Sequence, residues 1–173
     1  ANMPDDFWGK AQPDGTDIWA QGETSSETAV FSSEVNYIDI ANKKLELWVK
    51  IPSLSSSVDT VVYVNYGDSN LAQVQDTAVW DANHVMVHHM DGDPDASSPQ
   101  FLDSTSNNHD GIADAVLDTA DLIDGPFGKA INVDDNTATG IAIAASADFN
   151  LGVGSFSMEA VFKPHSFSTA HLR

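Results

Sequence analysis

Two stretches of the chain carry the clearest alternation of apolar and polar positions. Between residues 44 and 52, every second position is aliphatic, namely Leu45, Leu47, Val49 and Ile51. A period of two places these side chains on one face of a β-strand and Trp48 on the other. Residues 60–66 are rich in β-branched and aromatic residues, which favours a second strand. Pro52 and the Ser-rich run between the stretches favour a turn, so the pattern predicts two neighbouring antiparallel strands.

Shorter runs predict further strands, at residues 17–20, 29–40, 84–90, 112–117, 129–133, 140–144 and 155–163. Residues 71–79 show no clear face and fit either a single helical turn or an irregular connection. Residues 91–110 are rich in Asp, Ser, Asn and Pro, and this composition predicts a long surface loop without a packed core. Many short strands, frequent turn signals and no convincing helical pattern of ten residues predict an all-β fold of sandwich type.

Composition narrows the classes of partner. The chain has 173 residues and a net charge of −19, with a single arginine. A surface of this charge repels nucleic-acid backbones and anionic membranes, so we expect no nucleic-acid partner and no membrane insertion. No run of residues is long and apolar enough to span a bilayer. The chain has no cysteine, so the sequence carries no disulfide information.

The polar run at residues 91–110 is the candidate metal site. Carboxylates are the hard oxygen ligands that calcium takes in groups of about six to eight. The spacing is not that of an EF-hand, because Ala96 stands where glycine is required and Leu102 where a bidentate Glu is required. An ordinary solvated loop is the alternative. If calcium binds, the expected ligands are Asp91, Asp93, Asp103 and Asp110.

Histidine and tryptophan residues suggest two further kinds of site. His84 and His88 would share one face of a strand but lie roughly 13 Å apart, which is too far for one zinc ion, so structural or surface roles are expected for them and for His89. Tryptophan rings can stack on sugars when exposed. For Trp48, we expect burial at a junction between two domains instead. The tryptophans are Trp8, Trp19, Trp48 and Trp80.

Several motifs resemble known families. The runs Asp-Gly-Thr-Asp-Ile, Leu-Glu-Leu-Trp-Val-Lys-Ile-Pro and Val-Tyr-Val-Asn-Tyr-Gly-Asp resemble an uncharacterised domain family of microbial surface proteins; they lie at residues 14–18, 45–52 and 62–68. That family is found beside concanavalin A-like, or laminin-G-like, lectin domains. The later segments resemble strands and the acidic loop of such a lectin jelly roll, at residues 89–91, 103–111, 125–131 and 154–164.

The resemblance implies two consecutive β-sandwich, jelly-roll-like modules. Residues 1–79 would form the uncharacterised β-sandwich domain, and residues 80–173 the start of the concanavalin A-like lectin domain. Both modules would be incomplete, so the chain is expected to belong to a longer polypeptide. Laminin-G-like domains often hold calcium near their ligand-binding rim, which agrees with the candidate metal site.

The same resemblance implies a function. We expect a non-catalytic, extracellular binding or adhesion module, secreted or on the cell surface, with carbohydrate or a cell-surface or virion component as partner. Glucanases of the concanavalin A-like fold carry Glu-x-Asp-x-Glu or a close variant on one strand, and this chain has no such run. Two alternatives stay open: a polysaccharide-degrading enzyme with catalytic residues outside these 173 residues, and a structural component of a cell envelope or virus particle.

Overall fold

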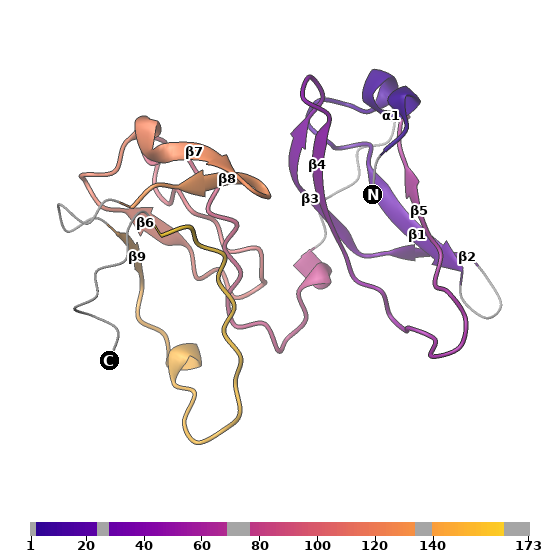
Figure 1. Cartoon of the computed structure of the whole chain (residues 1–173). Coiled ribbons are helices and arrows are strands. Elements are labelled where there is room, and N and C mark those ends of the chain that lie inside the picture. Colours follow the sequence, from indigo (N-terminus) through magenta and orange to yellow (C-terminus); the bar gives the residue numbers. More distant parts are fainter. Residues whose placement is uncertain (1–2, 24–27, 69–76, 134–139, 165–173) are drawn as a thin grey trace.

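The computed structural model describes residues 3–23, 28–68, 77–133 and 140–164. Figure 1 shows two lobes: an N-terminal lobe, residues 3–68, and a C-terminal lobe, residues 77–164. Apart from one short helix and single 3₁₀ turns, the regular structure of these residues is β, which confirms the predicted all-β class. Among the described residues, no helix is long and apolar enough to cross a membrane.

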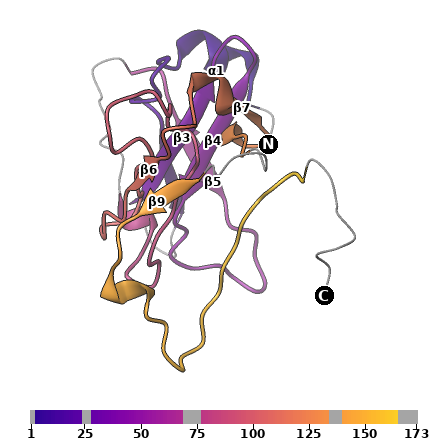
Figure 2. The same cartoon turned by 90° about the vertical axis from the view of Figure 1, so that its left-hand side faces the viewer.

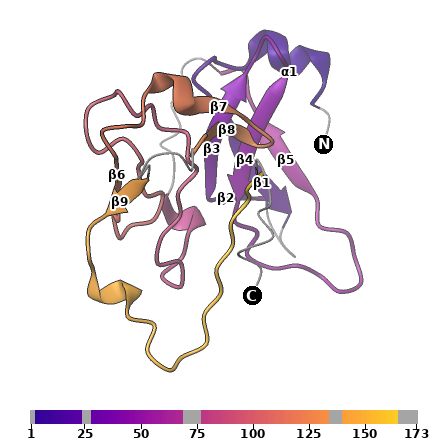
Figure 3. The ribbon, with the colours of Figure 1, turned by 60° about the vertical axis from the view of Figure 1, so that its left-hand side comes forward.

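The N-terminal lobe holds a short helix and two small antiparallel sheets (Figures 1 and 3). One sheet has the strand order β2-β1-β5 and the other pairs β3 with β4. Helix α1 carries Asp5 and Asp6 in its first turn and Lys10 in its last, an arrangement that suits the helix dipole. The elements are α1 (Asp5–Lys10), β1 (Trp19–Glu23), β2 (Thr28–Phe31), β3 (Ser33–Asp39), β4 (Lys44–Val49) and β5 (Val62–Asn65).

The core of this lobe lies between helix α1 and the inner face of the β3–β4 pair. Phe7, Ala11 and Ile18 are buried there. Leu45 and Leu47 pack against them, as the alternation predicted, whereas Ile51 lies beyond the end of β4. Further half-buried side chains complete the cluster: Met3, Trp8, Val35, Ile38, Ile40, Val64 and Tyr66.

The predicted pairing of the two clearest strands is wrong. Strand β4 pairs with β3, and β5 pairs with β1 in the other sheet. A long loop, residues 50–61, carries the chain from one sheet to the other. Each strand was identified correctly from its own residues, but the partner of a strand depends on contacts distant in sequence. A tight turn is needed to force neighbours to pair, and the Ser-rich loop is too long for one.

Residues 29–40 form two strands instead of one. Strand β2 ends at Phe31 and β3 begins at Ser33. Strand β3 then contains a bulge between Val35 and Tyr37, so that Tyr37 lies opposite Glu46. The bulge inserts one residue and shifts the alternation, which the simple period of two did not predict.

A buried carboxylate ties the loops of the N-terminal lobe together. Asp17 is 1% exposed, and its oxygens accept hydrogen bonds from the backbone N–H groups of Gln12 at 2.9 Å and Gly67 at 2.6 Å. Gly67 has a φ of 87°, a conformation that glycine adopts at little cost. These bonds link the segment after α1 to the turn after β5.

The C-terminal lobe contains two further strand pairs, β6 with β9 and β7 with β8, both antiparallel. Isolated bridges join His88 to Asp103 and Phe101 to Gly111. Figure 2 shows the lobe with β6 and β9 toward the viewer. The elements are η1 (Thr77–Val79), β6 (Gly111–Ala113), η2 (Thr119–Asp121), β7 (Leu122–Gly125), β8 (Gly128–Ile131), β9 (Ile141–Ile143) and η3 (Ala147–Phe149).

The polar run at residues 91–110 is not the coreless surface loop that its composition predicts. Phe101 is 1% exposed, and Asp103 and Thr105 are also buried. The carboxylate of Asp103 accepts bonds from the backbone N–H groups of Val87, Thr105 and His109, so a polar segment can pack without unsatisfied donors. The strand predicted at residues 84–90 is reduced to the single bridge at His88.

The strand predicted at residues 155–163 is also absent. This segment is extended, but the described part of the chain offers it no partner strand and no hydrogen bond. Phe156 is 60% exposed and Phe162 79% exposed. Alternating apolar residues favour a strand only where a neighbouring strand or sheet covers one face, and a sequence pattern does not supply that neighbour.

The remaining predictions have mixed outcomes. The strands predicted at residues 17–20, 129–133 and 140–144 are confirmed as β1, β8 and β9 with shifted bounds. The strand predicted at residues 112–117 ends at Ala113, because the chain turns where the Leu117 N–H donates to the Asp114 carbonyl. Residues 69–76 lie outside the described residues, and η1 follows them as a single turn. Helix α1 and strand β7 were not predicted.

Replacing Phe7 with alanine tests the position of the core. The side chain is fully buried, and its ring contacts the rings of Trp8 and Tyr66 at centroid distances of 4.7 and 4.8 Å. We expect Phe7→Ala to lower the free energy of unfolding by about 3–5 kcal/mol, measured by denaturant titration. The exposed Phe156 is the matched control, and Phe156→Ala should change it by less than about 0.5 kcal/mol. Equal effects would contradict this assignment of the core.

Candidate ligand-binding groove

A groove of about 720 Å³ lies where the two lobes meet. Its size falls within the usual range for small-molecule sites, roughly 300–1,000 Å³. The N-terminal lobe contributes side chains from α1, β3, β4 and β5, and the C-terminal lobe contributes the turn between β7 and β8. The lining residues are Met3, Asp5, Trp8, Tyr37, Lys43, Lys44, Leu45, Glu46, Leu47, Val64, Pro126, Phe127 and Gly128.

Aromatic and aliphatic side chains form much of the groove's lining. Leu45, Leu47 and Val64 also pack on the N-terminal core. Trp8 packs its ring edge-to-face against Phe7, which holds the indole in place. Phe127, on the turn of the other lobe, is 61% exposed. A large exposed ring beside an apolar lining is typical of a binding surface.

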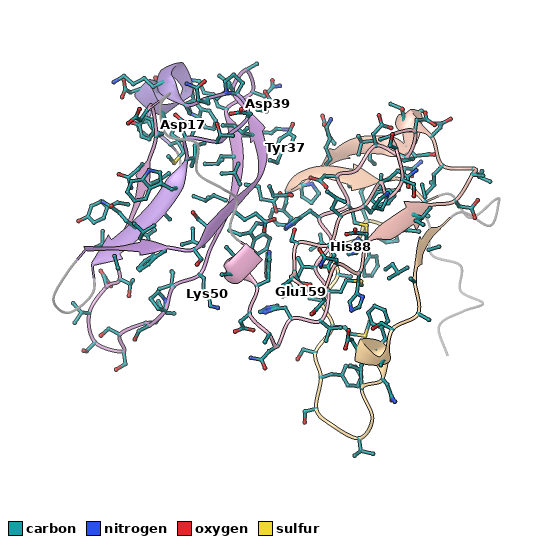
Figure 4. All side chains as sticks on the ribbon, turned by 180° about the vertical axis from the view of Figure 1, so that it is seen from behind. Asp17, Tyr37, Asp39, Lys50, His88 and Glu159 are labelled. Atoms are coloured by element: carbon teal, nitrogen blue, oxygen red, sulfur yellow. The ribbon has the colours of Figure 1, made fainter. Side chains whose placement is uncertain are left out.

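The turn between β7 and β8 reaches the N-terminal lobe because residue 128 is a glycine. Gly128 is buried, with a φ of 88°, and a Cβ built there would lie 2.9 Å from the Cβ of Tyr37 and 3.2 Å from Oε2 of Glu46. Neither the backbone conformation nor the space suits a larger residue. Figure 4 shows Tyr37 on the side of β3 that faces the C-terminal lobe. The bulge in β3 therefore supplies the surface on which the turn rests.

Charged side chains add polar groups to the lining of the groove. The ammonium of Lys43 lies 2.6 Å from Oδ1 of Asp5, and this hydrogen bond and charge lower the pKa of the Asp5 carboxyl below its ordinary value of 3.8. Glu46 accepts bonds from the Asn36 amide at 2.9 Å and from the Trp48 indole at 3.1 Å. Both carboxyl groups thus have fixed partners, which orients their oxygens.

A second group of contacts joins the lobes on the same outer face of β3 and β4. The carboxylate of Glu34 accepts bonds from the Trp80 indole at 2.7 Å and the Ser104 hydroxyl at 2.8 Å, and Nε2 of His89 lies 3.4 Å away. The Trp48 ring lies 5.0 Å from that of Trp80, between centroids. We call Glu34, Trp48, Trp80, His89 and Ser104 the junction cluster.

The junction cluster is not a catalytic triad. Ser104 and His89 both bond to Glu34, and no hydrogen bond between the two is present. A nucleophilic serine requires the imidazole as its immediate base, with the carboxylate behind the imidazole. Here the Ser104 hydroxyl donates its hydrogen bond directly to the Glu34 carboxylate, which suits a structural contact between lobes.

The four predicted calcium ligands do not share one position. Asp103 and Asp110 are neighbours, but Oδ1 of Asp110 accepts a bond from the Asp103 N–H at 2.8 Å. Asp93 instead accepts a bond from the Thr119 hydroxyl at 2.8 Å, and Asp91 is exposed. Among the described residues, no three acidic or histidine side chains are arranged to hold a metal ion. The geometry gives no support to calcium, which stays a prediction.

The histidines and tryptophans have distinct environments. His84 lies against Asp81, His88 bonds to the His109 carbonyl and His89 faces Glu34. Trp48 lies at the junction between lobes, as predicted, but is 40% exposed and not buried. The sequence analysis missed Glu34, Tyr37, Glu46 and Phe127. For Phe127 there was a signal, because an aromatic residue within Gly-Pro-Phe-Gly projects from a turn.

Asp103 offers a test of the polar packing in the C-terminal lobe. Its burial acts to raise its pKa, but bonds from the amides of Val87, Thr105 and His109 outweigh burial and lower the pKa below 3.8. A lowered pKa means that ionised Asp103 contributes stability above pH 3.8, and that this contribution is lost as pH falls through the folded-state pKa.

We therefore expect Asp103→Asn to lower the free energy of unfolding at neutral pH by at least about 2 kcal/mol, because the amide keeps only one acceptor oxygen and the buried donors that bond to the other oxygen lose theirs. The variant should also lose less stability than the parent on acidification, in denaturant titrations from about pH 5 to about pH 2. Asp59→Asn, at an exposed position, is the control and should behave as the parent. An unchanged acid response in Asp103→Asn would contradict this role of the carboxylate.

Comparison with protein-family models, with curated proteins and with solved structures found no match to the chain. The resemblance to surface-protein and lectin-like families therefore rests on the motifs in the sequence alone. No family assignment follows from these comparisons.

Proposed function

We propose that the protein is a non-catalytic carbohydrate-binding module, secreted or displayed on a cell surface, and that the groove between the lobes holds the sugar. The observation that carries this proposal is the combination of three aromatic residues, Trp8, Tyr37 and Phe127, with charged side chains in one groove of about 720 Å³. Small-molecule sites characteristically combine an apolar lining with a few placed polar groups.

Saccharides match such a lining for a chemical reason. A pyranose ring presents C–H groups on its faces, which pack on aromatic rings, and hydroxyl groups around its edge, which donate and accept hydrogen bonds. The exposed face of Phe127 and the ring of Trp8 offer packing surfaces. The carboxylates of Asp5 and Glu46 offer acceptors, and Lys44 offers a donor.

The charges favour a neutral saccharide over an anionic one. In the groove, the ammonium of Lys43 is already paired with Asp5. Hydrogen bonds from Asn42 and Lys129 are the largest causes that lower the pKa of Asp39 and Asp124, respectively, and the charge of Lys44 adds to both shifts. The net charge of −19 adds repulsion toward polyanions.

The groove chemistry also suits binding rather than hydrolysis. Glycosidases need a carboxylic acid whose pKa is raised so that it can protonate the leaving group. Lys43 instead lowers the pKa of Asp5, which keeps this carboxyl ionised. An ionised carboxylate with a fixed partner serves as a hydrogen-bond acceptor for hydroxyl groups.

Phe127→Ala tests the proposal. We expect the parent chain to be retarded in gels containing a neutral soluble polysaccharide, such as a β-glucan, xylan or galactomannan, and much less in gels containing alginate. Loss of the ring should weaken the binding about tenfold, because stacking on an aromatic ring contributes roughly 1.4 kcal/mol to the free energy of binding.

Phe156→Ala is a matched control, since Phe156 is 60% exposed and Phe127 is 61% exposed. Phe156 does not line the groove, so its variant should bind as the parent does. If no polysaccharide in the panel retards the parent, the proposal fails for those sugars. If both variants lose binding equally, the groove is not the site.

Calcium binding within residues 91–110 stays a prediction, and melting temperatures measured with calcium and with magnesium test it. If Asp103 and Asp110 bind calcium, millimolar calcium should raise the melting temperature by several degrees. Magnesium should raise it less, because it gives up its water reluctantly. Asp110→Ala should remove the difference between the two ions. Equal effects of both ions, unchanged in the variant, would indicate general screening of the charge of −19.

A further inference from the structure

We propose that the exposed segment at residues 155–163 is a dimerisation strand, through which two copies of the chain pair as antiparallel strands. In this dimer, Glu159 of each copy lies opposite Lys163 of the other copy, and the two Val161 residues face each other on a two-fold axis. The proposal goes beyond sugar binding, because no residue of the segment lines the groove.

The first observation is that the segment has the pattern of a strand but no partner among the described residues. Every residue from 155 to 164 is exposed, and no backbone group of the segment takes part in a described hydrogen bond. Figure 2 shows the segment running apart from the sheets of both lobes. Phe156, Met158, Ala160 and Phe162 lie on one face of an extended chain. An unpaired backbone with one apolar face can pair with a strand of another chain.

The charge of the segment identifies a second copy as the partner. The whole chain has a net charge of −19, but residues 155–163 carry one acid and one base, Glu159 and Lys163, and are neutral as a segment. Two copies therefore approach each other with the least repulsion at this segment. Because one strand carries both signs, its own antiparallel copy offers a base to each acid. Opposite charges that face each other across an antiparallel pair stabilise the pair.

The two charges select one register. With Val161 on the two-fold axis, each Glu159 lies opposite Lys163 of the other copy. With Glu159 on the axis, the two carboxylates would face each other, and like charges in this position destabilise a strand pair. With Ala160 on the axis, Glu159 would face Val161, and neither charge would have an opposite partner. The register centred on Val161 is therefore favoured.

The apolar face fits the same register. Each Phe162 lies opposite Ala160 of the other copy, so a large ring faces a small side chain. The two Phe162 rings are diagonal neighbours, a separation that aromatic side chains can bridge. Pro164 lies opposite Met158. Proline has no N–H, which suits a pair that exchanges no backbone hydrogen bonds, and such pairs alternate with bonded ones in an antiparallel ladder.

The pairing predicts a weak dimer. The paired positions run only from Met158 to Pro164 in each copy, and two short strands alone are marginally stable in water. Repulsion between the two chains, each with a charge of −19, also opposes the pairing. We therefore expect a Kd between about 10 µM and about 1 mM. A third copy would approach a dimer with twice the charge of one chain, so association stops at two copies.

The experiment is sedimentation velocity on the whole chain without polysaccharide, so its outcome is separate from that of the sugar-binding test. Concentrations should run from about 10 µM to about 1 mM in about 0.15 M NaCl. We expect the dimer fraction of the parent to rise with concentration across this range. A parent that stays monomeric throughout overturns the proposal.

Two charge reversals test the register. Glu159→Lys sets bases opposite each other, and Lys163→Glu sets acids opposite each other. Each variant alone should dimerise at least about tenfold more weakly than the parent, because the dimer contains the charge pair twice. Glu159→Lys should do so although it changes the net charge by +2, from −19 to −17, and thus reduces the overall repulsion.

An equimolar mixture of the two variants is the decisive sample. In a mixed pair, both bases of the Glu159→Lys chain face both acids of the Lys163→Glu chain. The mixture should therefore dimerise about as strongly as the parent, although neither variant does so alone. If the mixture stays monomeric, or if each variant alone dimerises like the parent, this register is wrong and the proposal is overturned.

Phe162→Ala tests the apolar face of the dimer. The substitution removes both rings from the strand pair, and we expect the dimer to weaken about tenfold. Leu54→Ala is the control, because Leu54 is 72% exposed and lies in the loop at residues 50–61 of the N-terminal lobe. This variant should dimerise as the parent does. Equal weakening by both substitutions would place the dimer contact elsewhere and overturn the proposal.

Discussion

The β3–β4 pair is the element on which the rest of the structure depends, because both of its faces are used. The inner face carries Leu45 and Leu47 into the N-terminal core. The outer face carries Glu34 and Trp48 to the junction with the C-terminal lobe. The bulge after Val35 makes this possible, since it returns Ile38 to the core while Tyr37 faces outward opposite Glu46. Core, junction and groove are therefore set by one strand pair.

Local sequence patterns predicted the elements better than their partners. The alternation at Leu45 and Leu47 identified a strand and its buried face correctly. The same pattern predicted that this strand pairs with the β-branched run that forms β5, but the two strands lie in different sheets. Side-chain periodicity reports which face is covered, but strand pairing is decided by long-range contacts that the period does not encode. The all-β class follows from the number of strands and does not require correct pairing.

The candidate sites were harder to predict because their residues are brought together from distant segments. Glu34 and Ser104 are 70 positions apart and meet across the junction. The acidic run suggested a metal site, yet Asp103 uses its oxygens to satisfy backbone amides. Composition shows how many carboxylates could serve as metal ligands. The fold decides whether each carboxylate faces a neighbouring N–H or an open position. For Phe127, the sequence indicated only a position in a turn and did not indicate a contact with the other lobe.

The exposed segment at residues 155–163 has a consequence for behaviour in solution. Its apolar side chains and its backbone present a template for another strand, and such templates promote association between molecules. Every copy carries a charge of −19, so copies repel one another over the Debye length, about 10 Å at 0.1 M salt. Colloidal stability thus rests on charge rather than on covered edges. Added salt shortens the range of that repulsion. It therefore lowers the protein concentration up to which the copies stay dispersed.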